Sequence, residues 1–192
     1  SSDVCSSDLY DYQVGCGDLW TDKATFATSD GEKDHADFFV LGDIQADDLT
    51  NITAIRDTLK DRHWNFGLQT GDAVDNPRTY KDWEDYTGLF NGETMGSTNM
   101  VQVLGNHELQ GEALESKTMF GLDASYGGSC YSRTYGNVYL AVINYTGNAA
   151  QLRSALEWLK TDVQSSNADW KILTMHQPPY YTNESGGNAE IY

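Results

Sequence analysis

The chain has 192 residues, which fits about one domain and is long enough to bury a sizeable hydrophobic core. Hydrophobic residues make up 39% of it, including 12 Tyr and 5 Trp, which excludes disorder as a description of the whole chain. The formal net charge of −17 argues against nucleic acid or an anionic membrane as a partner, because both need Lys and Arg to neutralise phosphates, and no apolar run of ~18 residues could span a bilayer.

The first thirty residues have a different character from the rest. Residues 1–9 are rich in Ser and Asp without periodicity, so we predict a non-native segment there. Residues 10–29 alternate apolar and polar side chains across a Gly/Asp turn, which predicts two antiparallel strands. An isolated hairpin is marginally stable in water, so we expect these strands to belong to a larger sheet whose beginning is missing. Polar residues 29–37 predict a linker and a boundary near residue 30.

After the linker, short apolar runs alternate with segments of helical periodicity. Such strand and helix units, three in all, favour an α/β sheet. The runs at 38–41, 64–70 and 100–104 predict strands, and the segments 49–59 and 80–90 predict helices. Further along, the pattern predicts a hairpin of 131–135 with 138–144, an amphipathic helix at 151–164 and a strand at 171–176.

Two groups of side chains bear on packing. Tyr80, Trp83, Tyr86 and Phe90 recur at helical spacing, which is typical of a core-facing stripe. Cys16 and Cys130 could form one disulfide in an oxidising compartment or remain two thiols, and their spacing does not decide between these alternatives.

Polar side chains follow four of the apolar runs at the point where each predicted strand ends. These residues are Asp43, Asp72, Asn106 and His176. In α/β sheets such strand ends converge on one crevice, where ligands bind. A single Gly-Asp is usually a turn or a helix cap, but Asp, Asn and His in this order are ligands suited to Mn, Fe or Zn. The pattern therefore predicts metal binding.

The motifs around these residues resemble a known family. The segments Gly42-Asp43-Ile44-Gln45, Gly71-Asp72-Ala73-Val74-Asp75, Gly105-Asn106-His107-Glu108 and Met175-His176-Gln177-Pro178 look like the first four ordered motifs of the calcineurin-like metallophosphoesterases. The resemblance spans residues 37–192. It implies an α/β fold that is part of a four-layer α/β-β/α sandwich, with 30–192 as the N-terminal part of that domain.

The hairpin ahead of these motifs carries a second resemblance. It looks like the end of the fibronectin-like domain that precedes the catalytic domain in secreted enzymes similar to purple acid phosphatases, which assigns residues 10–29 to a remnant of that domain. This resemblance implies an extracellular or periplasmic location.

Carried over residue by residue, the family resemblance implies two divalent or trivalent metal ions, Fe, Mn or Zn. Asp43 would bind the first, Asp72 would bridge both, and Asn106 with His176 would bind the second. Gln45 stands where members often have a His ligand, and its amide is a weaker ligand.

The same resemblance implies a catalytic group beside the metals. His107 would act as general acid for the leaving alkoxide, oriented by Glu108 or Asp75. The reaction implied is hydrolysis of a phosphate monoester or diester, because two cations ~3.5–4 Å apart can hold both the attacking and the leaving oxygen. The partner would be a phosphate-ester small molecule or a phosphorylated substrate, and the sequence does not reveal an oligomeric state.

Other features depart from the family pattern. Asp75 ends the motif in which purple acid phosphatases carry a Tyr, so no ferric charge-transfer band is expected. The final Gly-His-x-His motif of the family does not occur before Tyr192, so each metal would lack one ligand and the fragment alone is expected to be inactive. A non-catalytic secreted or surface binding module is the alternative function, and a metal-dependent nuclease is disfavoured by the acidic charge.

Overall fold

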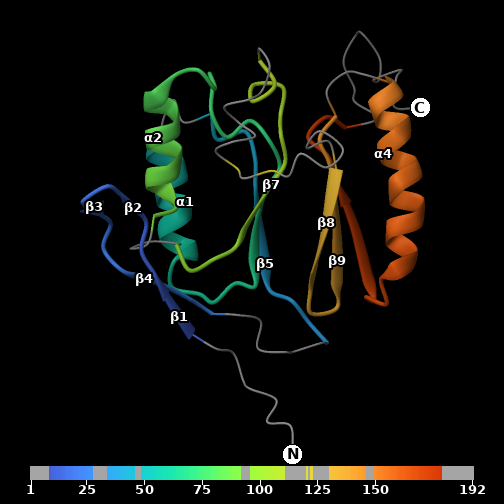
Figure 1. The fold of residues 1–192 in the computed structure, drawn as a ribbon, viewed down its shortest axis with the longest axis horizontal. Helices are drawn as coiled ribbons and strands as arrows, with labels where there is room; N and C mark the ends of the chain where they lie inside the picture. Colours follow the sequence, from blue (N-terminus) through green and yellow to red (C-terminus); the bar gives the residue numbers. More distant parts are fainter. Residues whose placement is uncertain are drawn as a thin grey trace, which may run out of the picture.

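Two three-stranded sheets form the centre of the computed structural model, which describes residues 9–27, 34–45, 49–91, 96–110, 120, 122, 130–145 and 149–178 (Figure 1). In the first sheet, the parallel strands β5 (Phe38–Leu41), β6 (Phe66–Gln69) and β7 (Met100–Gln102) lie side by side in that order. The second has the order β10-β9-β8, with β9 (Val138–Ile143) antiparallel to β8 (Cys130–Tyr135) and parallel to β10 (Trp170–Thr174).

Helices lie on the outer sides of both sheets. α1 (Leu49–Leu59) connects β5 to β6, and α2 (Tyr80–Leu89) lies between β6 and β7 in the chain; both cover the same side of the first sheet in Figure 1. α4 (Ala149–Asp162), continued by the short helix η2 (Val163–Ser165), precedes β10 and lies beside the second sheet. The predicted α/β class is confirmed.

The two sheets share one hydrophobic core. Strand alternation turns Phe66 and Leu68 of the first sheet toward the second, where they meet side chains of β9. Phe66, which is fully buried, stacks on Phe38 at 4.7 Å and on Tyr135 at 4.4 Å between ring centroids. The sequence predicted strand and helix units of an α/β sheet; the structure divides the strands between two sheets packed face to face.

The aromatic stripe of α2 packs as predicted except at its first residue. Trp83 and Tyr86 are buried, and Phe90 is partly buried against them. Tyr80, by contrast, is 80% exposed, so its assignment to the core was wrong. It is the first residue of the helix, and helical spacing alone does not show where the packed part of a face begins.

The predicted N-terminal hairpin is present. Its base pairs β1 (Leu9–Tyr12) with β4 (Ala24–Ala27), and its tip pairs β2 (Gly15–Cys16) with β3 (Leu19–Trp20), both antiparallel. The hydroxyl of Tyr12 donates to the carbonyl of Gly96 at 2.9 Å, which ties the hairpin to the loop before β7. Residues 1–8 and 28–33, within the predicted non-native segment and linker, lie outside the described residues.

Two further expectations concern the thiols and the membrane. Cys16 is exposed at the hairpin tip while Cys130 is buried at the start of β8, and no disulfide joins them. Of the two alternatives for this pair, the structure therefore has thiols. Within the described part of the chain, none of the helices combines the length and the apolar character needed to cross a membrane.

Candidate metal centre

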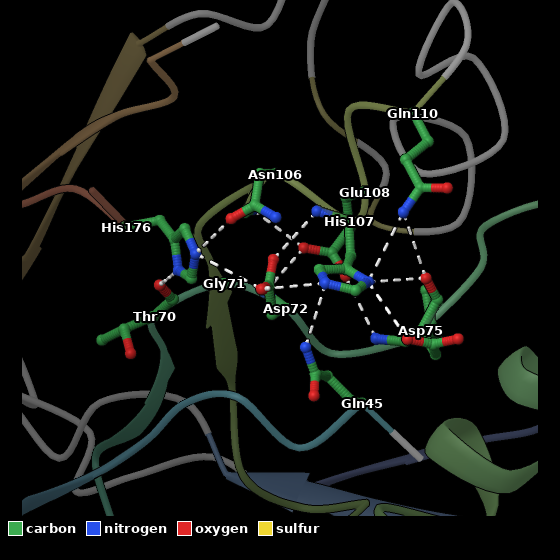
Figure 2. A network of polar contacts seen from close by, with 12 residues as sticks. Gln45, Thr70, Gly71, Asp72, Asp75, Asn106, His107, Glu108, Gln110 and His176 are labelled. Atoms are coloured by element: carbon green, nitrogen blue, oxygen red, sulfur yellow. Dashed lines mark hydrogen bonds and ion pairs between the residues drawn. The ribbon is translucent and has the colours of Figure 1, made fainter. Parts of the chain in front are cut away.

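The predicted ligands lie together, although they do not come from one sheet. Asp43, Asp72 and Asn106 follow β5, β6 and β7, whose carboxyl ends share one edge because the strands are parallel. His176 follows β10 and so comes from the second sheet. Figure 2 shows His176 and Asn106 turned toward Asp72. The crevice expected at the end of one sheet is thus built across the ends of two.

The loops after β5 and β6 are joined by their backbones. The N–H of Asp43 donates to the carbonyl of Gly71 at 3.0 Å, and the N–H of Gln45 donates to that of Asp72 at 2.9 Å. Asp43, Gln45 and Asp72 have φ values of 52°, 52° and 54°, in the left-handed region that costs a non-glycine residue about 1–2 kcal/mol. The tight turns of these loops therefore involve the functional residues themselves, as strained backbone often does at binding sites.

Two glycines are needed because the loops approach each other closely. A Cβ at Gly71, whose φ is 107°, would meet Cγ of His176 at 2.6 Å. A Cβ at Gly105 would overlap the amide nitrogen of Asp72 and lie 2.8 Å from its carboxylate carbon. Glycine at these positions lets His176 and Asp72 enter the cluster.

Gly105→Ala is expected to displace Asp72, because the obstructing atoms are backbone and a short buried side chain. We expect a loss of about 1–3 kcal/mol in unfolding free energy and at least ~10-fold weaker Mn²⁺ binding. Denaturant unfolding and calorimetric titration measure both. Gly88→Ala is the matched control, because a Cβ there meets open space on α2 and should stabilise the helix. Wild-type Mn²⁺ affinity in Gly105→Ala would contradict the prediction.

The donor atoms form a compact cluster. Ligand atoms of Asp43, Asp72 and His176 all lie within 4.8 Å of one another. Nε2 of His176 is 3.5 Å from Oδ2 of Asp72 and 3.1 Å from Oδ1 of Asn106. Asp72 is buried while Asp43 is exposed, so the cluster opens toward solvent on one side.

The environment of His176 prepares its Nε2 for a cation. Nδ1 donates to the carbonyl of Thr70 at 2.9 Å, which fixes the ring and leaves Nε2 facing the cluster. The hydrogen bond with Asp72 raises the pKa of His176 to about 9 against the opposing effect of burial. Burial alone would raise the pKa of Asp72, but the contacts with His176 and with the N–H of His107 outweigh it and lower that pKa. A metal ion at this position would compete with a proton for Nε2 of His176.

His107 lies on the other side of Asp72. Its Nδ1 donates to the carbonyl of Asp75 at 2.7 Å and is 3.3 Å from Oδ1 of that residue, while Nε2 is 3.7 Å from Oδ2 of Asp72. The hydrogen bond to the Asp75 carbonyl raises the pKa of His107; burial opposes this, and the carboxylates of Asp72 and Asp75 add to it. Asp75, one of the two residues proposed to orient His107, contacts its ring through both its carbonyl and its carboxylate.

Two glutamines complete the surroundings of His107. Nε2 of Gln45 lies 3.1 Å from Nε2 of His107, and Figure 2 shows the amide nitrogen turned toward the ring. Nε2 of Gln110 is 3.4 Å from Nδ1 of the same histidine. Gln110 was not predicted from the sequence. Its position one turn after His107 is the sequence feature that could have indicated this contact. The role of Gln45 as a metal ligand stays a prediction.

Glu108 contacts the backbone of the loops after β6 and β7. It is fully buried, and its oxygens accept hydrogen bonds from the backbone N–H groups of Asp72, Val74 and Gly105. Burial raises the pKa of this carboxyl, although these three N–H groups oppose the shift. Glu108 thus contacts the backbone of both loops, and its role in orienting His107 stays a prediction.

The donor set fits a transition metal. Carboxylate, amide and imidazole groups are suited to Zn, Mn or Fe, and the cluster leaves open positions for other ligands. The donors at the strand ends of this α/β fold are grouped closely enough that they could hold a metal ion. The family model described as calcineurin-like phosphoesterase matches residues 36–192. The chain therefore belongs to the calcineurin-like phosphoesterases.

A solved structure supports the same fold. A purple acid phosphatase from yellow lupin (Lupinus luteus) seeds aligns with a TM-score of 0.66 and 16% sequence identity over 85% of this chain. The chain spans 34% of the lupin protein, about a third of its length. No curated protein matches the chain. The resemblance inferred from the four motifs is confirmed at the level of the family.

Proposed function

We propose that the protein hydrolyses phosphate esters, monoesters or diesters, with two metal ions of Fe, Mn or Zn. The observation that carries the proposal is the group of donors from Asp43, Asp72 and His176 within 4.8 Å of one another, in a chain of this family. Asp43 would bind the first ion, Asp72 would bridge the pair, and Asn106 with His176 would bind the second. A bound cation pair supplies a clamp for the attacking and leaving oxygens of an in-line displacement.

His107 is the proposed proton donor to the leaving oxygen. Its Nδ1 is engaged by Asp75, which leaves Nε2 facing the side where Asp72 lies. The raised pKa keeps this imidazole protonated to higher pH than a free histidine, as a general acid requires. Asp75 is proposed to hold the ring in this orientation through contacts of 2.7 Å and 3.3 Å.

The surroundings of the site belong to the same proposal. The shared core between the sheets, with helices outside both, supports a four-layer α/β-β/α sandwich for residues 30–192. Residues 10–29 are proposed to be the end of a fibronectin-like domain, supported by their antiparallel hairpin. An extracellular or periplasmic location and a small phosphate ester or phosphorylated substrate complete the assignment.

Hydrolysis of p-nitrophenyl phosphate and of bis(p-nitrophenyl) phosphate tests the function. The protein expressed from its complete gene, stripped with chelator and reloaded with Mn²⁺, Zn²⁺ or iron, is expected to release nitrophenolate, and chelator should remove the activity. The ratio of the two rates separates a monoesterase from a diesterase. No turnover with any metal would sink the proposal.

A second candidate is a non-catalytic binding module that keeps the fold. The observation that favours it is Gln45, which contacts His107 and occupies a position where the family often supplies a metal ligand. Metal analysis of the same preparation decides, since fewer than two ions per chain without hydrolysis would favour the module. Plasmid nicking tests the nuclease alternative, which the net charge of −17 disfavours.

A further inference from the structure

One buried carboxylate joins the two loops that carry the central ligands. Oε2 of Glu108 accepts from the N–H of Asp72 and from the N–H of Gly105, both at 2.8 Å. Oε1 accepts from the N–H of Val74 at 3.1 Å. Asp72 and Glu108 are 36 residues apart in the chain, so these bonds connect the end of β6 with the end of β7.

A carboxylate at this position needs an explanation, because burying a charge is unfavourable unless hydrogen bonds compensate it. Glu108 is 0% exposed, whereas an apolar side chain could fill the same space without that penalty. An apolar side chain, however, cannot accept hydrogen bonds from the N–H groups of both loops. Such charge-assisted bonds are short and directional, so they fix backbone positions.

The same two loops are held together by other contacts that depend on this spacing. The N–H of His107 donates to Oδ1 of Asp72 at 3.0 Å, which aims the carboxylate. Gly105 has no Cβ, and its backbone approaches the amide of Asp72. Glu108 therefore lies behind the point where the loop of Asp72 meets the loop of Asn106.

We propose that Glu108 is the positioning residue of the metal centre: its carboxylate sets the spacing of Asp72 and Asn106 before any metal binds. This rests on the proposed function insofar as those residues are metal ligands, and it concerns metal affinity rather than the chemical step. The competing role is general stabilisation of the fold. The two roles predict different results. Only a positioning role makes a Glu108 variant bind metal more weakly than a control variant that has lost the same amount of stability.

Glu108→Gln keeps the size of the side chain and one acceptor oxygen but turns a donor toward a backbone N–H. We expect ~10–100-fold weaker Mn²⁺ binding in calorimetric titration of the protein from its complete gene. We also expect faster hydrogen exchange at the amides of Asp72 and Gly105 in the metal-free protein, beyond any change in global stability. The exchange readout does not depend on enzymatic activity.

Tyr131→Phe is the matched control. It removes a hydroxyl that donates to the carbonyl of Gln102 at 2.6 Å and accepts from its N–H at 3.1 Å, and so weakens the contact between β8 and β7. Mn²⁺ affinity within about twofold of wild type is expected. Equal losses of affinity in both variants, at similar losses of stability, would overturn the proposal, as would wild-type affinity and exchange in Glu108→Gln.

Glu108→Asp keeps the test decisive if Glu108→Gln does not fold. Its shorter carboxylate cannot reach both loops in the same way, so an affinity loss is expected in a folded, charged variant; unchanged affinity overturns the proposal. A wild-type protein that binds Mn²⁺ but hydrolyses no ester refutes the proposed function and leaves this test intact. A wild-type protein that binds none of Mn²⁺, Zn²⁺ and iron overturns both.

Discussion

Asp72→Ala is expected to abolish phosphoesterase activity and to weaken Mn²⁺ binding by more than ~100-fold, since loss of a group one shell further out already costs ~10–100-fold. Asp72 is the residue at which the contacts of the site converge. Its carboxylate lies 3.5 Å from His176 and 3.7 Å from His107. Calorimetric titration and the p-nitrophenyl phosphate assay measure the two losses.

Stability provides the control for this variant. Removing Asp72 also takes away the charge that raises the pKa of His176, so some change in unfolding is expected and must be measured in parallel. Asp61→Ala, an exposed acid just after α1, should leave affinity and activity unchanged. Full activity in a folded Asp72→Ala protein would refute a metal-bridging role.

His107→Ala is expected to lower kcat by about 10²–10⁴-fold, the range typical of general acid–base catalysis, while metal content stays at the wild-type value. Metal content should not change, because the His107 ring contacts Asp72 but is not one of the clustered donors, which come from Asp43, Asp72 and His176. The loss should be greater for phenyl phosphate than for p-nitrophenyl phosphate, because the poorer leaving group depends more on protonation.

His63→Ala serves as the matched control, since His63 is exposed outside the motifs and should be silent. Equal losses of kcat for both leaving groups would argue against a proton-donor role for His107. A parallel loss of metal would instead place His107 among the ligands.

The fold could be predicted from sequence where the signal is local. The helix predicted at 49–59 has those bounds, because Ile52, Ile55 and Leu59 repeat at helical spacing. The division into two sheets is implied by the resemblance to a four-layer sandwich, but periodicity alone does not predict it, because pairings such as β9 with β10 join distant segments and leave no periodic trace. His176 reaches the site from the second of these sheets.

The site shows the same limit. Ordered motifs identified Asp43, Asp72, Asn106, His107 and His176 as neighbours, and the structure brings them together. The contacts of Glu108 with backbone N–H groups could not be predicted, because such groups look alike at every residue. The left-handed backbone at Asp43 and Asp72 was likewise not predicted, because a Gly-Asp pair indicates a turn without showing that the Asp adopts a positive φ.

Anomalous diffraction from crystals of the protein grown with Mn²⁺ or Zn²⁺ would show directly whether metal ions bind at this cluster. We expect anomalous peaks about 2.0–2.2 Å from ligand atoms of Asp72 and His176, with Asp43 and Asn106 on either side. Peaks confined to other parts of the surface, with these four side chains unmoved and unliganded, would contradict this expectation.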